Sequence, residues 1–92
     1  MVRSFRHTGI ELLFKTGSKA GIQPHHASKL QMQLTALDAA KSPADLNRAG
    51  WNLHELKGGQ KDRYSIKVNG NWRLTFEFEN QDAVLIDYED YH

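Results

Sequence analysis

The sequence predicts an α+β, two-layer domain in which N-terminal helices pack on one face of a mainly antiparallel, twisted sheet. Apolar residues recur at helical spacing in the first half of the chain, and from Trp51 onward they alternate with polar residues. The dipeptide Asn69-Gly70 separates two alternating runs and is a strong β-hairpin signal. Helices followed by strands favour this arrangement. A chain of 92 residues predicts one domain, 1–92, with one core.

The first elements are a short strand and a capped helix. Residues 2–5 are expected to form the strand. In the next segment, 7–17, Thr8 and Glu11 have the spacing of a capping box, in which each side chain satisfies the other's free backbone N–H group. Gly17 is a suitable residue to end this helix.

Two more helices are expected before the sheet. Pro24 suits the first turn of a long helix over residues 24–42, and Ser42 with the proline that follows begins a short third helix that ends at Gly50. The long helix carries one apolar stripe. The stripe comprises Ala27, Leu30, Leu34 and Leu37.

Four strands should follow, over residues 51–56, 63–68, 72–79 and 83–89. A two-residue hairpin loop at 69–70 would place Ile66 opposite Arg73 and a charge on the apolar face, so a three-residue loop is preferred. The apolar face then holds Tyr64, Ile66, Val68, Trp72, Leu74, Phe76 and Phe78. The polar face holds Ser65, Lys67, Arg73, Thr75, Glu77 and Glu79. Twist makes the polar face concave, and we expect the functional site there.

Composition excludes several classes of protein. The chain has no cysteine, which excludes a disulfide scaffold, a thiol nucleophile and a cysteine-ligated metal. Its longest aliphatic run, 83–86, is too short to span a bilayer, and the N-terminus lacks the apolar region of a signal peptide. We therefore expect a cytoplasmic protein.

The net charge of +1 conceals an uneven distribution. Residues 1–53 carry seven Lys or Arg and three acids, and residues 54–73 carry five against two. Residues 74–92 carry six acids and no Lys or Arg. This pattern is compatible with an ordinary mixed surface, which is the commoner case, or with a basic surface for a polyanion beside an acidic strand.

Neither the histidines nor the serines complete a familiar catalytic or metal-binding motif. The run "HELKG" at 54–58 begins like a zinc-protease motif but lacks its second histidine, and no G-x-S-x-G is present. We predict no metal and no cofactor. The adjacent His25 and His26 are interpreted as surface residues, and His7 is given no role.

Two residues in the strand region could serve a site or only the surface. His54 precedes the loop "KGGQKD", with Lys57 within one loop turn, and the spacing alone favours a histidine at the rim over a catalytic one. Arg73 offers a rigid fork for a phosphate, although a cross-strand partner for Glu77, Glu79 or Asp87 is at least as common.

The chain ends on "DYEDYH". If the last strand pairs with the strand at 72–79, residues 90–92 project from one end of the sheet, at the end of a central strand. RNA cleavage without a metal needs a base for the 2′-OH, a cation for the charge on phosphorus and an acid for the leaving 5′-oxygen. The sequence contains all three kinds of group, and their convergence in space is a hypothesis.

The run "LHELKGGQKDRYSIKVNGNWRLTFEF" with the terminal "DYEDYH" closely resembles the HigB-type toxins of bacterial toxin–antitoxin modules, within the RelE/ParE superfamily. The N-terminal "RSFRHTGIELLFKTG" also looks like that family, so the resemblance covers nearly the whole chain. It implies a metal-independent endoribonuclease that cleaves translated mRNA in the ribosomal decoding site. It also implies neutralisation by a HigA-like helix-turn-helix antitoxin, with operator DNA bound only through the toxin–antitoxin complex.

The resemblance also implies roles for particular residues. The catalytic set is His54, Asp90, Tyr91 and His92, and the phosphate-binding set is Lys57 and Arg73. The loop reads "GQKD" where the family often carries an arginine and then a glycine, so either Lys61 or Arg63 is expected to supply the missing cation. Lys67 is expected as a further RNA contact. Asp90 or His54 would be the base and His92 the acid, while Tyr91 would stack on or position a base of the RNA.

Two alternatives stay open at this point. The same superfamily includes a non-catalytic branch that poisons gyrase, and fold alone does not separate a nuclease from such a protein-binding inhibitor. A ribosome- or RNA-binding module without turnover is the third possibility.

Overall fold

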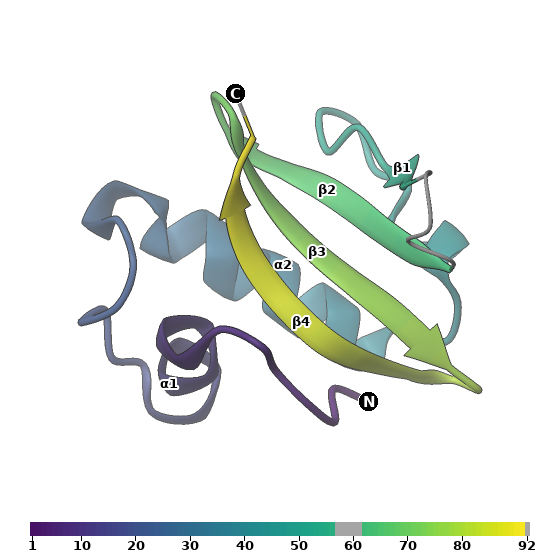
Figure 1. Ribbon diagram of the computed structural model, residues 1–92, viewed down its shortest axis with the longest axis horizontal. Coiled ribbons are helices and arrows are strands. Elements are labelled where there is room, and N and C mark those ends of the chain that lie inside the picture. The colour runs from purple at the N-terminus through teal and green to yellow at the C-terminus, as the bar shows by residue number, and fades with distance from the viewer. Residues whose placement is uncertain (57–61, 92) are drawn as a thin grey trace.

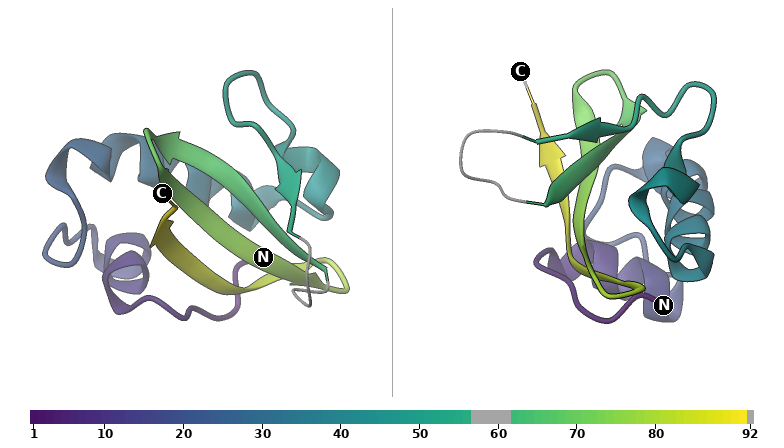
Figure 2. Two further views of the ribbon diagram at one scale, coloured as in Figure 1. Left: turned by 45° about the horizontal axis from the view of Figure 1, so that its top comes forward. Right: turned by 90° about the vertical axis from the view of Figure 1, so that its right-hand side faces the viewer.

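The computed structural model describes residues 1–56 and 62–91. Two helices, α1 (Thr8–Thr16) and α2 (Ala27–Ala39), lie on one side of a four-stranded antiparallel sheet, as Figures 1 and 2 show. The strands, in sheet order, are β1 (His54–Glu55), β2 (Arg63–Asn69), β3 (Trp72–Glu79) and β4 (Asp82–Asp90). Two 3₁₀ turns, η1 (Pro24–His26) and η2 (Pro43–Leu46), flank α2. The predicted α+β class and layer order are confirmed.

Helix α1 begins with a different cap from the one expected. His7 is the N-cap in extended conformation, and its ring Nδ1 accepts a hydrogen bond of 3.2 Å from the Ile10 backbone N–H. The capping box of Thr8 and Glu11 is therefore wrong, because Thr8 is already inside the helix and the Glu11 N–H donates to the His7 carbonyl at 3.1 Å. Gly17 ends the helix in a left-handed conformation with φ 79°, as predicted.

The long second helix is shorter than expected. Residues 24–26 form η1, α2 begins at Ala27, and the chain turns extended at Ala40 before Pro43. The expected third helix is only the 3₁₀ turn η2. The predicted stripe is confirmed as core, since all four of its residues are at least 96% buried. The ring of His26 is 2% exposed, so its interpretation as a surface residue is wrong.

Two of the expected strands are reduced. Residues 2–5 form only isolated parallel bridges, from Val2 to Ala83 and from Phe5 to Ile86. The strand expected at 51–56 is limited to the two residues of β1. The sheet order therefore makes β4 an edge strand, which corrects its expected place at the centre of the sheet.

The register of the β2–β3 hairpin is as predicted, with Ile66 opposite Leu74. The connection differs in detail: Asn69 pairs with Trp72 across a two-residue turn, and a bulge between Lys67 and Asn69 supplies the extra residue. Gln33 of α2 donates its side-chain amide to the Lys67 carbonyl at 2.8 Å and so satisfies an acceptor beside this bulge.

A second bulge decides which residues of β4 face the polar side. The register between β3 and β4 shifts between Thr75 and Glu77, and Leu85 has φ 53°. Ser4 stabilises this bulge, because its Oγ accepts from the Leu85 N–H at 2.9 Å. Because of the inserted residue, Asp87 and Glu89 lie on the polar face. Without it, Ile86 and Tyr88 would lie there instead.

Candidate functional site

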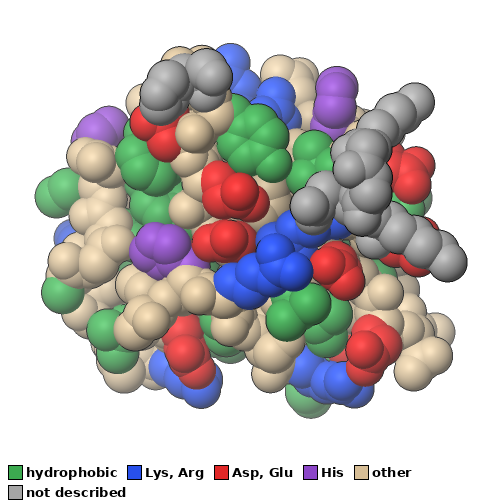
Figure 3. Space-filling view, viewed as in Figure 1, with side chains coloured by type: hydrophobic (Ala, Val, Ile, Leu, Met, Phe, Trp, Pro, Cys, Tyr) green, Lys and Arg blue, Asp and Glu red, His purple; other side chains and the backbone are tan. Residues whose placement is uncertain are grey.

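The antiparallel register aligns polar side chains in two neighbouring rows across the sheet. One row runs His54, Ser65, Thr75, Asp87 from β1 to β4. The next row is Lys67, Arg73, Glu89. Side chains two residues apart on a strand share a face, so both rows belong to the polar face. Figure 3 shows acidic and basic side chains gathered at the centre of this face.

Arg73 lies at the middle of the second row and is half-buried. Its Nη1 donates to Ser65 Oγ at 3.2 Å and to the Asn52 carbonyl at 3.4 Å. Both acceptors are neutral, and within residues 1–56 and 62–91 this guanidinium has no ion pair. The expected alternative of a carboxylate partner is not what the structure shows, so the positive charge of Arg73 is available to an anionic ligand.

Arg63 has the opposite environment. It is 1% exposed, and its guanidinium donates to Thr75 Oγ1 at 2.8 Å and pairs with the Glu77 carboxylate at 3.3 Å. Thr75 in turn donates to Glu89 at 2.5 Å. A buried, paired guanidinium holds strands together and is not exposed to an RNA backbone. Lys67, half-buried on the same face, is the more accessible of these two expected contacts.

Tyr91 lies over the same face. Its backbone N–H donates to the Asn71 carbonyl at 2.8 Å, and 39% of the residue is exposed. Burial raises the pKa of Tyr91, the charges of Glu89 and Asp87 raise it further, and those of Arg63 and Arg73 lower it. The phenol hydroxyl is therefore among these charges and stays protonated at neutral pH, where it can donate a hydrogen bond or a proton.

The remaining expected residues are distributed unevenly. His54 is exposed in the first row, and its partner Ser65 is the residue to which Arg73 donates. Asp90 pairs with Trp72 and alternates to the side of Tyr88, whose pKa its charge raises. Lys57, Lys61 and His92 lie outside the described residues.

The structure thus brings Arg73, Lys67 and Tyr91 together, with His54 in the adjacent row and Asp90 on the other side of the strand end. Sequence reasoning missed Ser65, Thr75 and Glu89 as residues of the site. Alternation assigned the two hydroxyl side chains to the polar face, but a lone serine or threonine carries no motif that would select it.

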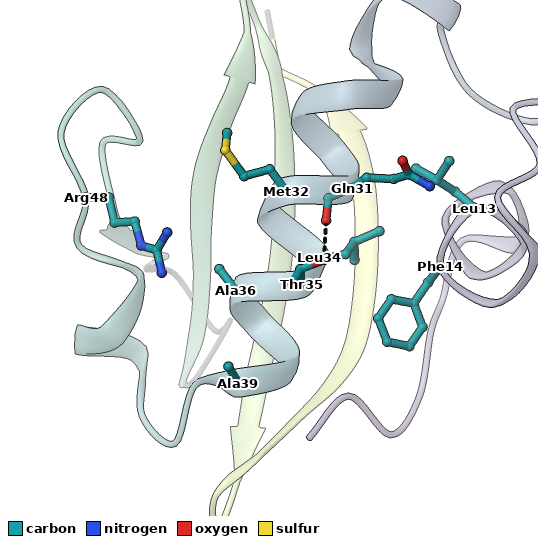
Figure 4. Close-up of a pocket in the computed structure, with 9 residues that line it drawn as sticks. All are labelled: Leu13, Phe14, Gln31, Met32, Leu34, Thr35, Ala36, Ala39 and Arg48. Atoms are coloured by element: carbon teal, nitrogen blue, oxygen red, sulfur yellow. Dashed lines mark hydrogen bonds between the residues drawn. The ribbon is translucent and has the colours of Figure 1, made fainter.

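A groove of about 640 Å³ lies on the helical side of the molecule, between α1, α2 and Arg48 (Figure 4). Its walls are mainly apolar, with Phe14 and Met32 facing it, and Arg48 is its charged side chain. A groove without an acid–base pair suits binding and not proton transfer.

Residues 1–56 and 62–91 contain no group of three or more histidines and carboxylates that could hold a metal ion. Over the same part of the chain, every helix is too short or too polar to cross a membrane.

A family model described as the RelE-like toxin of type II toxin–antitoxin system HigB matches residues 3–92. The chain therefore belongs to the HigB-like branch of the RelE-like toxins, and an antitoxin partner follows from membership of a type II system. Among curated proteins, the Endoribonuclease HigB of Proteus vulgaris is 42% identical over 92 residues, which is the full length of both chains. The resemblance found in the motifs is confirmed at the level of the family.

Proposed function

We propose that this protein is an endoribonuclease that cleaves translated mRNA in the ribosomal decoding site and thereby inhibits translation. The full-length, 42% identity to an endoribonuclease carries the proposal. The polar face supports it, because Arg73 has no carboxylate partner within the described residues and its charge acts on the protonated hydroxyl of Tyr91, whose pKa it lowers. A cation next to a hydrogen-bond donor is the arrangement that a phosphate in transfer requires.

The proposed reaction is an attack within the RNA strand. The 2′-oxygen loses its proton and forms a bond to phosphorus as the bond from phosphorus to the 5′-oxygen breaks, and the leaving oxygen takes up a proton. Arg73, with Lys57, stabilises the added charge on the phosphoryl oxygens. The Tyr91 hydroxyl positions the phosphate or its neighbouring base.

Of the two candidates for the base, the geometry favours His54. It shares the polar face with Arg73 through Ser65, whereas Asp90 alternates to the side of Tyr88. His92 is the proposed acid, supported by the family motif alone. Asp90 is then proposed to hold or orient the chain end instead of taking the proton.

The ribosome is proposed to align the mRNA for the reaction. A sheet face that is open to solvent does not fix the angle between the 2′-oxygen, phosphorus and the 5′-oxygen, so ordering of mRNA in the decoding site would contribute most of the alignment. We propose in addition that the cognate antitoxin is a HigA-like helix-turn-helix protein, that operator DNA is bound only through their complex, and that the toxin acts in the cytoplasm.

The test is to map mRNA 5′ ends by primer extension in a defined translation reaction, with and without ribosomes, after addition of the toxin. We expect new ends at particular codons that require ribosomes and disappear when the purified antitoxin is added. Inhibited translation without new ends would instead identify a non-catalytic inhibitor. Unaffected translation and intact mRNA would overturn the proposal altogether.

A further inference from the structure

A buried hydrogen bond joins the connection between the helices to the last strand. The ring Nδ1 of His26 lies 2.5 Å from the hydroxyl of Tyr88, and the two residues are 62 positions apart in the sequence. His26 is 2% and Tyr88 is 5% exposed. A buried hydrogen bond of this kind fixes the relative position of the two side chains, because breaking it would leave a buried donor and a buried acceptor unsatisfied.

Aromatic rings surround this hydrogen bond. Tyr88 stacks on Trp72 with ring centroids 4.5 Å apart and meets the edge of His7 at 5.4 Å. His26 meets Trp72 edge-on at 5.8 Å. Trp72 pairs across the sheet with Asp90, so the cluster lies directly against the end of β4.

The hydrogen-bonded pair of His26 and Tyr88 has a single protonation state at neutral pH. Burial, and then the charge of His25, lower the pKa of His26, so its ring is neutral and Nδ1 accepts a hydrogen bond from the Tyr88 hydroxyl. Burial raises the pKa of Tyr88, a hydrogen bond from the backbone of Gln23 lowers it, and the charge of Asp90 raises it. The tyrosine therefore remains a donor, and a protonated His26 would compete with it for the same hydrogen bond.

This contact matters because β4 is an edge strand. The N-terminal segment bridges its outer edge at Ala83 and Ile86, and the N–H groups of Arg6 and His7 both donate to the Ile86 carbonyl. Beyond Ile86, the contacts of the strand include its pairing with β3, which ends in the Tyr91–Asn71 hydrogen bond, the Thr75–Glu89 hydrogen bond on the polar face, and the aromatic cluster on the opposite face.

We propose that His26 and Tyr88 are positioning residues, whose hydrogen bond fixes the end of β4 and thereby holds Tyr91 over the polar face and Asp90 on the opposite side of the strand end. The consequence for RNA cleavage rests on the proposed function, whereas the fixing of the strand end does not. Neither residue touches the polar face itself, since both lie among the helices and the apolar face of the sheet.

The test compares three variants of the full-length protein. Tyr88→Phe keeps the ring on Trp72 and removes the hydroxyl. His26→Asn keeps an acceptor oxygen near the position of Nδ1 and should rescue the geometry. Tyr64→Phe is the matched control, because Tyr64 is a half-buried tyrosine of the apolar face, stacked on Phe76 at 6.3 Å, whose hydroxyl has no hydrogen bond within the described residues.

Two readouts separate positioning from general stability. In Tyr88→Phe, hydrogen exchange of the Tyr91 amide should be about tenfold faster, while the amides of β2 exchange as in the wild type. In the ribosome assay, kcat should fall about tenfold or more with KM little changed, because the reacting groups are displaced and not the binding surface. His26→Asn and Tyr64→Phe should stay within about twofold of the wild type in both.

Each outcome decides one question. Unchanged exchange at Tyr91 in Tyr88→Phe, or an equal change in Tyr64→Phe, overturns the positioning role. Faster exchange with an unchanged kcat keeps the fixing of the strand end and overturns its part in catalysis. If the wild type cleaves no RNA, the proposed function fails, and the exchange measurement still decides whether this hydrogen bond fixes the strand end.

Discussion

The hydroxyl of Thr75 donates a hydrogen bond of 2.5 Å to the carboxylate of Glu89. The same oxygen accepts from the Arg63 guanidinium at 2.8 Å, so one buried threonine connects a cation of β2 to an anion of β4 across the central strand. In this network the charge of Arg63 is buried and paired with Glu77. Arg73 has only neutral acceptors, so its charge is the one available to a ligand on the polar face.

Replacing Thr75 by valine should destabilise the protein by about 1–3 kcal/mol, because a buried guanidinium and a carboxylate lose their shared partner. The control is Thr35→Val. The hydroxyl of Thr35 is exposed and donates to the Gln31 carbonyl within α2 at 2.8 Å. Urea unfolding monitored by circular dichroism gives both values. Equal effects in the two variants would show that the Thr75 network contributes nothing beyond the loss of a hydroxyl.

Replacing Arg73 by alanine should lower kcat in the ribosome assay about 10²- to 10³-fold, the usual loss when a group that stabilises transition-state charge is removed. Arg73→Lys should recover only part of this rate, because an ammonium lacks the planar fork. The free energy of unfolding should change little in both, since the acceptors of Arg73 are neutral. Lys15→Ala, which removes an exposed pair with Glu11 on α1, is the control and should cleave as the wild type.

The effect of Arg63→Ala should be the reverse of that of Arg73→Ala. Loss of the buried guanidinium removes the donor to Thr75 and leaves the Glu77 carboxylate with only its longer ion pair to Arg6 at 3.9 Å, so the free energy of unfolding should fall clearly. Any loss of cleavage should then follow the fraction of unfolded protein. A folded Arg63→Ala variant that binds RNA more weakly would instead assign this arginine to the substrate.

If His54 is the base, His54→Ala should lower kcat about 10²- to 10⁴-fold without changing the free energy of unfolding, because its ring is exposed. Glu55→Ala is the matched control: it is the adjacent exposed residue of β1, opposite Tyr64 and thus on the other face. Full activity of His54→Ala, together with an inactive Asp90→Asn, would transfer the role of base to Asp90.

The sequence predicted the fold where a pattern repeated and missed it where single residues decide. Alternation over six residues was enough to pair Ile66 with Leu74, because any other register would bury charge. One inserted residue at Leu85 has no such signal: leucine seldom adopts φ 53°, and the Ser4 hydroxyl that stabilises the bulge is 81 residues away.

The same reasoning explains the errors in the site. Alternation assigns Arg63 to the polar face but does not reveal that neighbouring side chains cover it. Two adjacent histidines point to different sides, and the sequence does not say which of His25 and His26 is buried. Both outcomes depend on contacts between residues far apart in the chain, which local patterns do not contain.

Because His26 is buried, we expect the free energy of unfolding to fall in acid. Its pKa is lowered from 6.5 in the folded state, first by burial and then by His25, so the unfolded chain binds the proton more readily. The stability that neutral His26 contributes is therefore complete above about pH 6.5 and is lost progressively as the pH falls toward the folded-state pKa. All other titratable groups are present in both the wild type and His26→Asn, so the difference between their stability curves reports on His26.

Urea unfolding of the wild type and His26→Asn between about pH 7.5 and about pH 5 measures that difference. The variant should lose less stability on acidification, because asparagine accepts the Tyr88 hydroxyl at every pH and does not titrate. Parallel curves would mean that His26 takes up its proton equally well in the folded and unfolded chains. The buried hydrogen bond to Tyr88 would then survive protonation, contrary to what its neutral acceptor requires.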